Sequence, residues 1–276
     1  MAAERAHGPI GVFDSGFGGL NILAALRDLL PSEDLVYFGD SARSPYGSRP
    51  ADEVVRFSLE IGRWLVDEAG SKLVVVGCNT ASAVALDALR AELAVPVIGV
   101  VGAGARAARR CVGSGRVGVI GTERTIASGA YQRALADDAG VAVACPGLVE
   151  FVEAGQTTGP AVRAVIADRL APVVDAGVEV LLLGCTHYPY LAREIQAVVG
   201  EQVTLVSPAE EAAFEVAQRL GADGLARSGA VGSLRVACSG DPVVFREIGG
   251  RLFPGELGAI EQVPVEALEC RRTRSA

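Results

Sequence analysis

Two kinds of hydrophobic pattern alternate along the chain. Short, continuous apolar runs are separated by longer segments in which apolar residues recur every three or four positions. A continuous run is typical of a strand that is buried on both faces, and the recurring pattern is typical of a helix that covers it. Helices are predicted at 20–30, 51–70 and 208–220. The predicted strands are 10–15, 35–40, 73–78, 97–102, 116–121, 141–146, 178–185, 203–208 and 234–240.

This alternation predicts the α/β fold class with mostly parallel sheets. The chain has 276 residues, which is enough for one large or two modest domains. Half of the residues are apolar, so a sizeable core can form.

The sequence also repeats itself at a constant shift of 107 residues. Under this shift Gly11 coincides with Gly118, and Cys78 coincides with Cys185. The segment EAGSKLVVVGC matches DAGVEVLLLGC in the same alignment. The repeat predicts two similar α/β units, one beginning near residue 10 and the other near residue 117.

Polar side chains follow the predicted strands. Ligands of open parallel sheets bind at the carboxyl ends of the strands, so these residues are candidates for a site. If the two units face each other, both thiols reach one cleft from opposite sides. The residues are Asp14, Ser15, Asp40, Ser41, Cys78, Asn79, Thr80, Thr122, Cys185, Thr186 and His187.

Two facing thiols suit one particular reaction. A thiolate can remove a proton from a bound carbon, and a thiol on the opposite side can return one, which inverts the stereochemistry. Asp14 and His187 are candidates to accept or relay the thiol protons. The glycines at 16–19 open a helix, whose free N–H groups suit an anion. Further donors for carboxylates are the side chains of Ser15, Asn79, Thr80 and Thr186.

Composition and charge exclude several classes of protein. The net charge is −8 and no block of Lys or Arg is present, so a nucleic-acid or membrane surface is not expected. No apolar stretch reaches the roughly 18 residues of a membrane span. The N-terminal MAAERAHGP lacks the apolar core of a signal peptide. The six cysteines are far apart, which favours reduced thiols and a cytoplasmic protein.

Other chemistries fit the residues less well. Lys72 is the only lysine and lies at the entrance of a strand, so a pyridoxal phosphate cofactor is not expected. Cys78, Cys185 and His187 could form a zinc set, but no CxxC or HxxxH spacing supports a metal site. Neither thiol is followed closely by the arginine of a cysteine phosphatase. A binding protein without catalytic activity would not need two thiols at matched strand ends. If Cys78 and Cys185 are each considered alone, the ordinary interpretation is a small buried core residue. Cys111, Cys145, Cys238 and Cys270 are interpreted as core or surface thiols, although Cys145 could line the cleft.

Several motifs together resemble those of the glutamate racemases, within the aspartate/glutamate racemase family. The resemblance covers nearly all of the chain from residue 10 to about residue 266. The motifs are GVFDSGFGGL (11–20), FGDSARSPYG (38–47), VVGCNTASA (75–83), IGTERTIASGAY (120–131), ACPGLVEFVEAG (144–155), LLLGCTHYP (181–189) and SGDPVVF (239–245).

The resemblance implies an enzyme that interconverts L- and D-glutamate without a cofactor and supplies D-glutamate for bacterial peptidoglycan. Cys78 would act as the base on D-glutamate and Cys185 as the base on L-glutamate, assisted by Asp14 and His187. The residues that would hold the amino acid are Asp14, Ser15, Tyr46, Gly47, Asn79, Thr80, Glu153, Thr186 and His187.

The resemblance also implies two pseudo-symmetric α/β domains with the active site in the cleft between them. The first would comprise residues 1–99 plus 209–276, and the second residues 100–208. Family members are commonly homodimers, some inhibit DNA gyrase, and some are activated by a cell-wall precursor. A related racemase of aspartate or a hydantoin is the alternative, but the PYG loop at 45–47 and the HYP at 187–189 favour glutamate.

One stretch departs from the family pattern. Members usually carry CPxFVPLVE, whereas this chain has CPGLVEFVE at 145–153. Leu148 replaces the phenylalanine and Glu150 replaces the proline, while Glu153 matches the acidic position near the substrate amino group. Whether Glu150 or Glu153 faces the substrate is left open.

Overall fold

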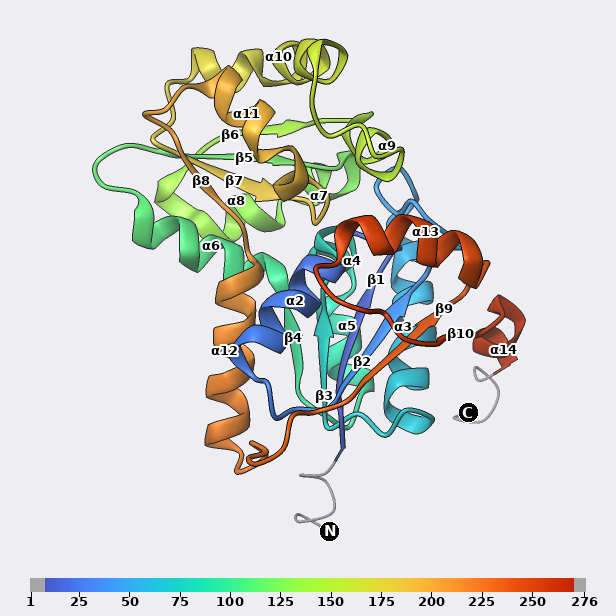
Figure 1. Cartoon of the computed structure of the whole chain (residues 1–276). Coiled ribbons are helices and arrows are strands. Elements are labelled where there is room, and N and C mark those ends of the chain that lie inside the picture. The colour runs from blue at the N-terminus through green and yellow to red at the C-terminus, as the bar shows by residue number, and fades with distance from the viewer. Residues whose placement is uncertain (1–7, 271–276) are drawn as a thin grey trace.

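The computed structural model describes residues 8–270 and contains two separate parallel sheets (Figure 1). The residues 1–7 and 271–276 of the predicted first domain lie outside the described part. One sheet has the order β10-β9-β2-β1-β3-β4 and the other β6-β5-β7-β8. The predicted α/β class is confirmed. The strands are β1 Ile10–Asp14, β2 Leu35–Gly39, β3 Leu73–Val76, β4 Val97–Gly99, β5 Val117–Gly121, β6 Ala139–Ala144, β7 Val180–Gly184, β8 Thr204–Val206, β9 Leu234–Cys238 and β10 Ile260–Gln262.

Helices cover the sheets and bury one face each. In α3, for example, Val54, Ile61 and Leu65 recur at helical spacing and are fully buried. No helix of the described residues is long and apolar enough to cross a membrane. The helices are α2 Leu20–Leu29, α3 Ala51–Asp67, α4 Asn79–Val84, α5 Leu86–Glu92, α6 Val100–Cys111, α7 Glu123–Ala127, α8 Ala130–Leu135, α9 Leu148–Glu153, α10 Pro160–Asp175, α11 Ala192–Val199, α12 Ala209–Ala222, α13 Pro242–Leu252 and α14 Val265–Glu269, with 3₁₀ turns η1 Ala136–Asp138 and η2 Tyr188–Leu191.

The sequence repeat corresponds to a structural repeat. The strands β2-β1-β3-β4 lie in the same order as β6-β5-β7-β8. Gly11 pairs with Val74 in the first sheet, and Gly118 pairs with Leu181 in the second. Both residues of the second pair lie 107 positions after those of the first, so the two sheets share the register of the sequence repeat. Cys78 and Cys185 therefore follow equivalent strands.

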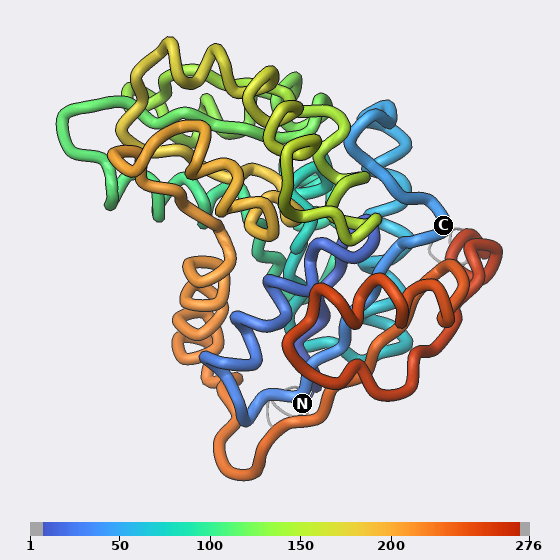
Figure 2. Tube along the Cα trace, turned by 45° about the horizontal axis from the view of Figure 1, so that its top comes forward, coloured from blue at the N-terminus to red at the C-terminus, as the bar shows by residue number. Residues whose placement is uncertain are grey.

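The chain crosses between the two units twice. It leaves the first sheet after β4 through α6, and after β8 it returns through α12, the orange helix of Figure 2. The returning segment adds β9 and β10 to the first sheet, where β9 pairs with β2. The domain boundaries near residues 99 and 209 stay a prediction.

Most predicted elements are confirmed within a few residues at their ends, but one predicted strand is too long and one observed strand was not predicted. The predicted strand 97–102 ends at Gly99, because α6 begins at Val100. Val100 and Val101 are buried helical residues, and a short apolar run does not distinguish a buried helix from a strand. The strand β10 was not predicted, because Ile260–Gln262 is short and largely exposed and contains one apolar residue.

Candidate active site

A cavity of about 80 Å³ lies between the carboxyl ends of the two sheets. It is lined by residues that follow β1, β3, β5 and β7, so the equivalent strands of both units contribute to it. Asp14 and Glu153 are not part of its lining. The predicted site residues that line it are Ser15, Tyr46, Gly47, Cys78, Asn79, Thr80, Thr122, Cys185, Thr186 and His187.

Cys78 is a buried thiol at the start of α4. Its Sγ accepts a hydrogen bond from the backbone N–H of Ala81 at 3.5 Å, so the sulfur caps the helix, and it donates to Ser15 Oγ at 3.6 Å. Burial, together with the charge of Asp14, raises the pKa of Cys78 to about 12. The side chain is therefore a neutral thiol near neutral pH.

Cys185 has a different neighbour. Its Sγ lies 3.9 Å from Nδ1 of His187, and Nε2 of that ring lies 3.1 Å from Oε1 of Glu153. Burial lowers the pKa of His187, but hydrogen bonds to Cys185 and Glu153 outweigh it and raise the pKa to about 10. His187 is therefore protonated near neutral pH. A protonated imidazole beside a cysteine is the partner that stabilises a thiolate.

Asp14 connects the two units from behind the cavity. Its carboxylate accepts a hydrogen bond from Gly16 N at 2.9 Å and from Thr186 Oγ1 at 3.3 Å. Burial raises the pKa of Asp14, and the charge of His187 opposes that shift. Asp14 belongs to the first sheet, and its carboxyl group contacts Thr186, the residue that follows Cys185 in the second unit.

The two acids of α9 have different positions. Glu150 lines the cavity, whereas Glu153 pairs with His187. The structure therefore gives each acid its own surroundings, which the sequence left open.

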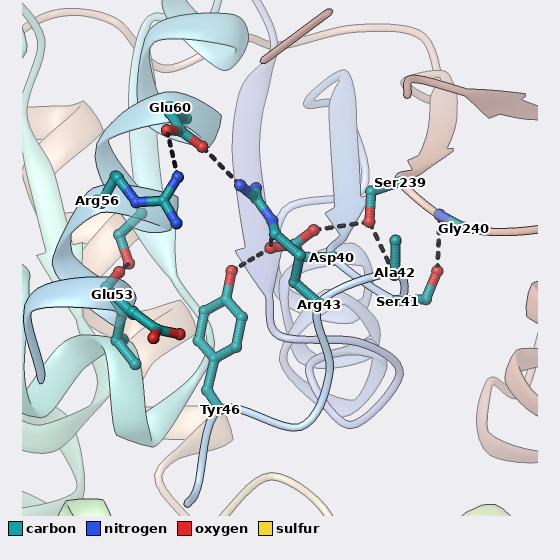
Figure 3. Close-up of polar contacts among 12 residues, drawn as sticks. Asp40, Ser41, Ala42, Arg43, Tyr46, Glu53, Arg56, Glu60, Ser239 and Gly240 are labelled. Atoms are coloured by element: carbon teal, nitrogen blue, oxygen red, sulfur yellow. Dashed lines mark hydrogen bonds and ion pairs between the residues drawn. The ribbon is translucent and has the colours of Figure 1, made fainter. Parts of the chain in front are cut away.

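Tyr46 lines the cavity, and its hydroxyl group points toward Asp40 (Figure 3). The hydroxyl donates a hydrogen bond to Asp40, which also accepts from Arg43 Nε at 2.8 Å and from Ser239 Oγ at 2.6 Å. Arg43 in turn pairs with Glu60 at 2.5 Å. This buried cluster of Asp40, Arg43, Tyr46, Glu60 and Ser239, which we call the Asp40 cluster, holds the loop before α3.

The second unit contacts the other end of the same loop. The backbone N–H of Arg124 donates to Gly47 O at 2.9 Å, and its Nε donates to Arg49 O at 2.8 Å. Nearby, the hydroxyl groups of Thr80 and Thr122 lie 2.9 Å apart across the cleft. The loop is therefore held by both units.

Sequence reasoning missed eight of the twenty lining residues. Most of the missed residues are chain neighbours of predicted ones, and this adjacency is the signal that could have found them. Cys145, which the sequence placed in the cleft only as an alternative, lines the cavity. The described lining contains no Lys or Arg, so hydroxyl, amide and backbone groups are its donors. The missed residues are Ser44, Pro45, Ser48, Glu123, Pro146, Gly147, Val149 and Tyr188.

The donor sets for other chemistries are not assembled. Within residues 8–270, no group of three or more His, Cys, Asp or Glu side chains lies close enough together to hold a metal ion. Cys78, Cys185 and His187 therefore do not form such a group. Lys72 lies at the amino end of β3, where it pairs with Glu33 at 2.6 Å.

Known proteins resemble this chain along nearly its whole length. The family model for Asp/Glu/hydantoin racemases matches residues 20–216. A glutamate racemase from Parafrankia is 46% identical over 264 residues, which cover 94% of this chain and 95% of that protein.

Solved structures agree with the sequence relatives. A crystal structure of glutamate racemase from Thermus thermophilus in complex with β-chloro-D-alanine has a TM-score of 0.86 and 46% identity, and the match covers 95% of this chain and 99% of that one. The glutamate racemase from Francisella tularensis in complex with D-glutamate has a TM-score of 0.89 and 32% identity, with coverage of 95% and 99%.

Proposed function

The chain belongs to the Asp/Glu/hydantoin racemase family, and we propose that it interconverts L-glutamate and D-glutamate by two-base proton transfer at Cα. Its class is that of a racemase, an amino-acid isomerase. One observation carries the mechanism: two thiols at equivalent strand ends line the same cavity. No cofactor takes part in the proposed reaction.

In the direction from L- to D-glutamate, Cys185 is the base. As a thiolate beside protonated His187, it removes the Cα proton of L-glutamate. The neutral thiol of Cys78 then donates its proton to the opposite face of the carbanion, which gives D-glutamate. This step leaves Cys78 as a thiolate and Cys185 as a thiol, and these are the protonation states that the reverse reaction requires.

The hydroxyl and amide groups of the lining support glutamate binding by directional hydrogen bonds. Hydroxyl and amide groups of Ser15, Asn79 and Thr80 would donate to the two carboxylates. Thr186, whose hydroxyl group donates to Asp14, lines the same cavity, as do Tyr46 and Gly47. Glu150 supplies a negative charge for the substrate ammonium group. Glu153 and Asp14 act behind the cavity, because they hold His187 and Thr186.

The wider role follows from the family alone. We propose that the D-glutamate serves peptidoglycan synthesis in the cytoplasm and that the enzyme is a homodimer of two-domain subunits. Inhibition of DNA gyrase rests only on the resemblance, and no described residue argues for it.

Proton exchange in D2O tests the proposed function. Purified protein with a chelator and without pyridoxal phosphate is given either enantiomer, and Cα deuteration is followed by NMR and optical rotation by polarimetry. Both enantiomers should exchange and converge to the racemate. Exchange of aspartate in place of glutamate would change the substrate, and no exchange of any amino acid would favour a binding protein.

Single-thiol variants test the two bases. Cys78→Ser and Cys185→Ser should each abolish racemisation, because each direction needs both groups. Cys238→Ser is the matched control, since Cys238 is a buried thiol at the end of β9 that does not line the cavity. Near-normal turnover in either active-site variant would contradict the assignment.

A further inference from the structure

Tyr131 is a buried tyrosine of α8 that contacts both halves of the site. It is fully buried, and its hydroxyl group donates a hydrogen bond to Oδ1 of Asn79. Asn79 directly follows Cys78 and belongs to the first unit, whereas α8 belongs to the second. The bond therefore crosses the cleft beside one of the two thiols.

The ring of Tyr131 packs beside the other thiol. A Cβ atom on Gly184 would lie 2.9 Å from Cε2 of the ring, and Gly184 directly precedes Cys185. A Cβ atom on Gly104 would lie 3.2 Å from the tyrosine hydroxyl oxygen. The ring thus occupies a space that two glycines leave open, next to the residue that precedes Cys185.

Asn79 has a donor that remains unused among the described residues. Its Oδ1 is occupied by Tyr131, but its buried Nδ2 has no hydrogen-bond partner within residues 8–270. Asn79 lines the cavity, and a buried amide donor without a partner costs free energy. Because the amide group is planar, the bond to Oδ1 also fixes the direction of Nδ2.

We propose that Tyr131 is a positioning residue, which orients the Asn79 amide so that Nδ2 donates to a carboxylate of bound glutamate. This inference rests on the proposed function. The hydroxyl group stays a donor throughout the working range of pH, since burial raises the pKa of Tyr131 further above its ordinary value. Tyr131 acts on the substrate only through Asn79.

The variant Tyr131→Phe removes the hydroxyl group and keeps the ring. Loss of one hydrogen bond that orients a binding group should raise KM for both enantiomers about tenfold, with kcat changed less than about threefold. Tyr190→Phe is the matched control. The Tyr190 hydroxyl also joins the two units, through Leu252 O at 2.9 Å, but it does not line the cavity, so KM should stay at the wild-type value.

A double-variant cycle separates positioning from a merely structural role. In an Asn79→Ala background, Tyr131→Phe should cause no further rise in KM, because the residue through which it acts is gone. An undiminished rise there, an equal rise in Tyr190→Phe, or an unchanged KM in Tyr131→Phe would overturn the inference.

If Tyr131→Phe does not fold, as judged by circular dichroism, the variant Asn79→Asp tests the inference in its place. This variant keeps the oxygen that accepts from Tyr131 and replaces the donor Nδ2 by an oxygen. KM should therefore rise at least about tenfold, as expected for Tyr131→Phe. An unchanged KM would overturn the inference. These outcomes all assume an active wild type. A wild type that does not racemise glutamate would instead contradict the proposed function.

Discussion

At the scale of single residues, the two thiols are chemically unequal although their strands are equivalent. Cys78 faces the carboxylate of Asp14 and is held as a neutral thiol, while Cys185 lies beside protonated His187. Under the proposed mechanism this difference suits L-glutamate, with Cys185 as the base and Cys78 as the acid on the opposite side. Pseudo-symmetry of the backbone does not require symmetric electrostatics, because the neighbours come from different loops.

The raised pKa of His187 predicts a pH-dependent stability. The folded state binds this proton more tightly than the unfolded state, so the stabilisation is complete below pH 6.5 and is lost as the pH rises through about 10. The difference in unfolding free energy between the wild type and His187→Gln should therefore shrink with rising pH, by at most about 1.4 kcal/mol per pH unit. Urea denaturation of both proteins across this range measures it. A difference that does not change with pH would contradict a protonated His187.

Gly18 is predicted to be irreplaceable because the second unit approaches it closely. A Cβ atom there would overlap Thr186 Oγ1 and lie 2.5 Å from Nδ1 of His187. Gly18→Ala should therefore reduce kcat/KM at least about a hundredfold, since displacement of reacting groups by about 1 Å costs that much. Gly221→Ala in α12 is the control, because a Cβ atom there meets nothing within 4 Å. Equal activity of the two variants would show that the cleft can widen without loss.

At the scale of elements, the loop between β2 and α3 depends on buried charges. The Asp40 cluster holds its beginning, and Arg124 holds its end. Glu60 is almost fully buried and pairs with Arg43 and Arg56, while buried Arg43 also pairs with Asp40, so these charges compensate one another as a network. The loop that covers the cavity is thus coupled to helix α3.

Glu60→Gln should destabilise the protein and disturb this loop. We expect a loss of about 2–4 kcal/mol of unfolding free energy, because Arg43 keeps its buried charge and loses an ionised partner. KM should rise as well, since the loop lines the cavity. Glu53→Gln on the same helix is the control: its pair with Arg49 is partly exposed and should contribute less than about 1 kcal/mol. Urea denaturation and steady-state kinetics measure both effects, and equal losses would rule out a special role of the cluster.

At the scale of the whole molecule, the fold divides the cysteines into two accessible and four inaccessible thiols. Cys111 and Cys270 are exposed, and the other four are buried. Ellman's reagent should therefore modify two thiols rapidly in the native protein without loss of activity, and the remaining four only after unfolding. The double variant Cys111→Ser/Cys270→Ser should lose the rapid phase and keep its activity. Inactivation during the rapid phase would mean that the reagent reaches Cys78 or Cys185.

Much of the fold could be predicted because its signals are local. Continuous apolar runs marked nearly all strands, and the shift that relates Cys78 to Cys185 indicated two similar units from the order of residues alone. The prediction was wrong where local patterns are ambiguous, as at Val100, or weak, as in β10. Most of the predicted cavity residues directly follow strands, because strand ends of parallel sheets meet at one edge, whereas Tyr46 and Gly47 were predicted only from the family resemblance.

By itself, the sequence determined the α/β class, the repeat and the presence of two thiols at strand ends, since each depends on neighbours in the chain. Only the tertiary structure decided which hydrogen-bond partner each polar side chain has. His187 pairs with Glu153 over a separation of 34 residues, and Tyr131 pairs with Asn79 over 52. The Tyr46 hydroxyl group likewise donates to Asp40, six residues earlier in the chain. Such contacts follow from the packing of whole elements, and packing in turn sets the burial and the charges that make the two thiols unequal.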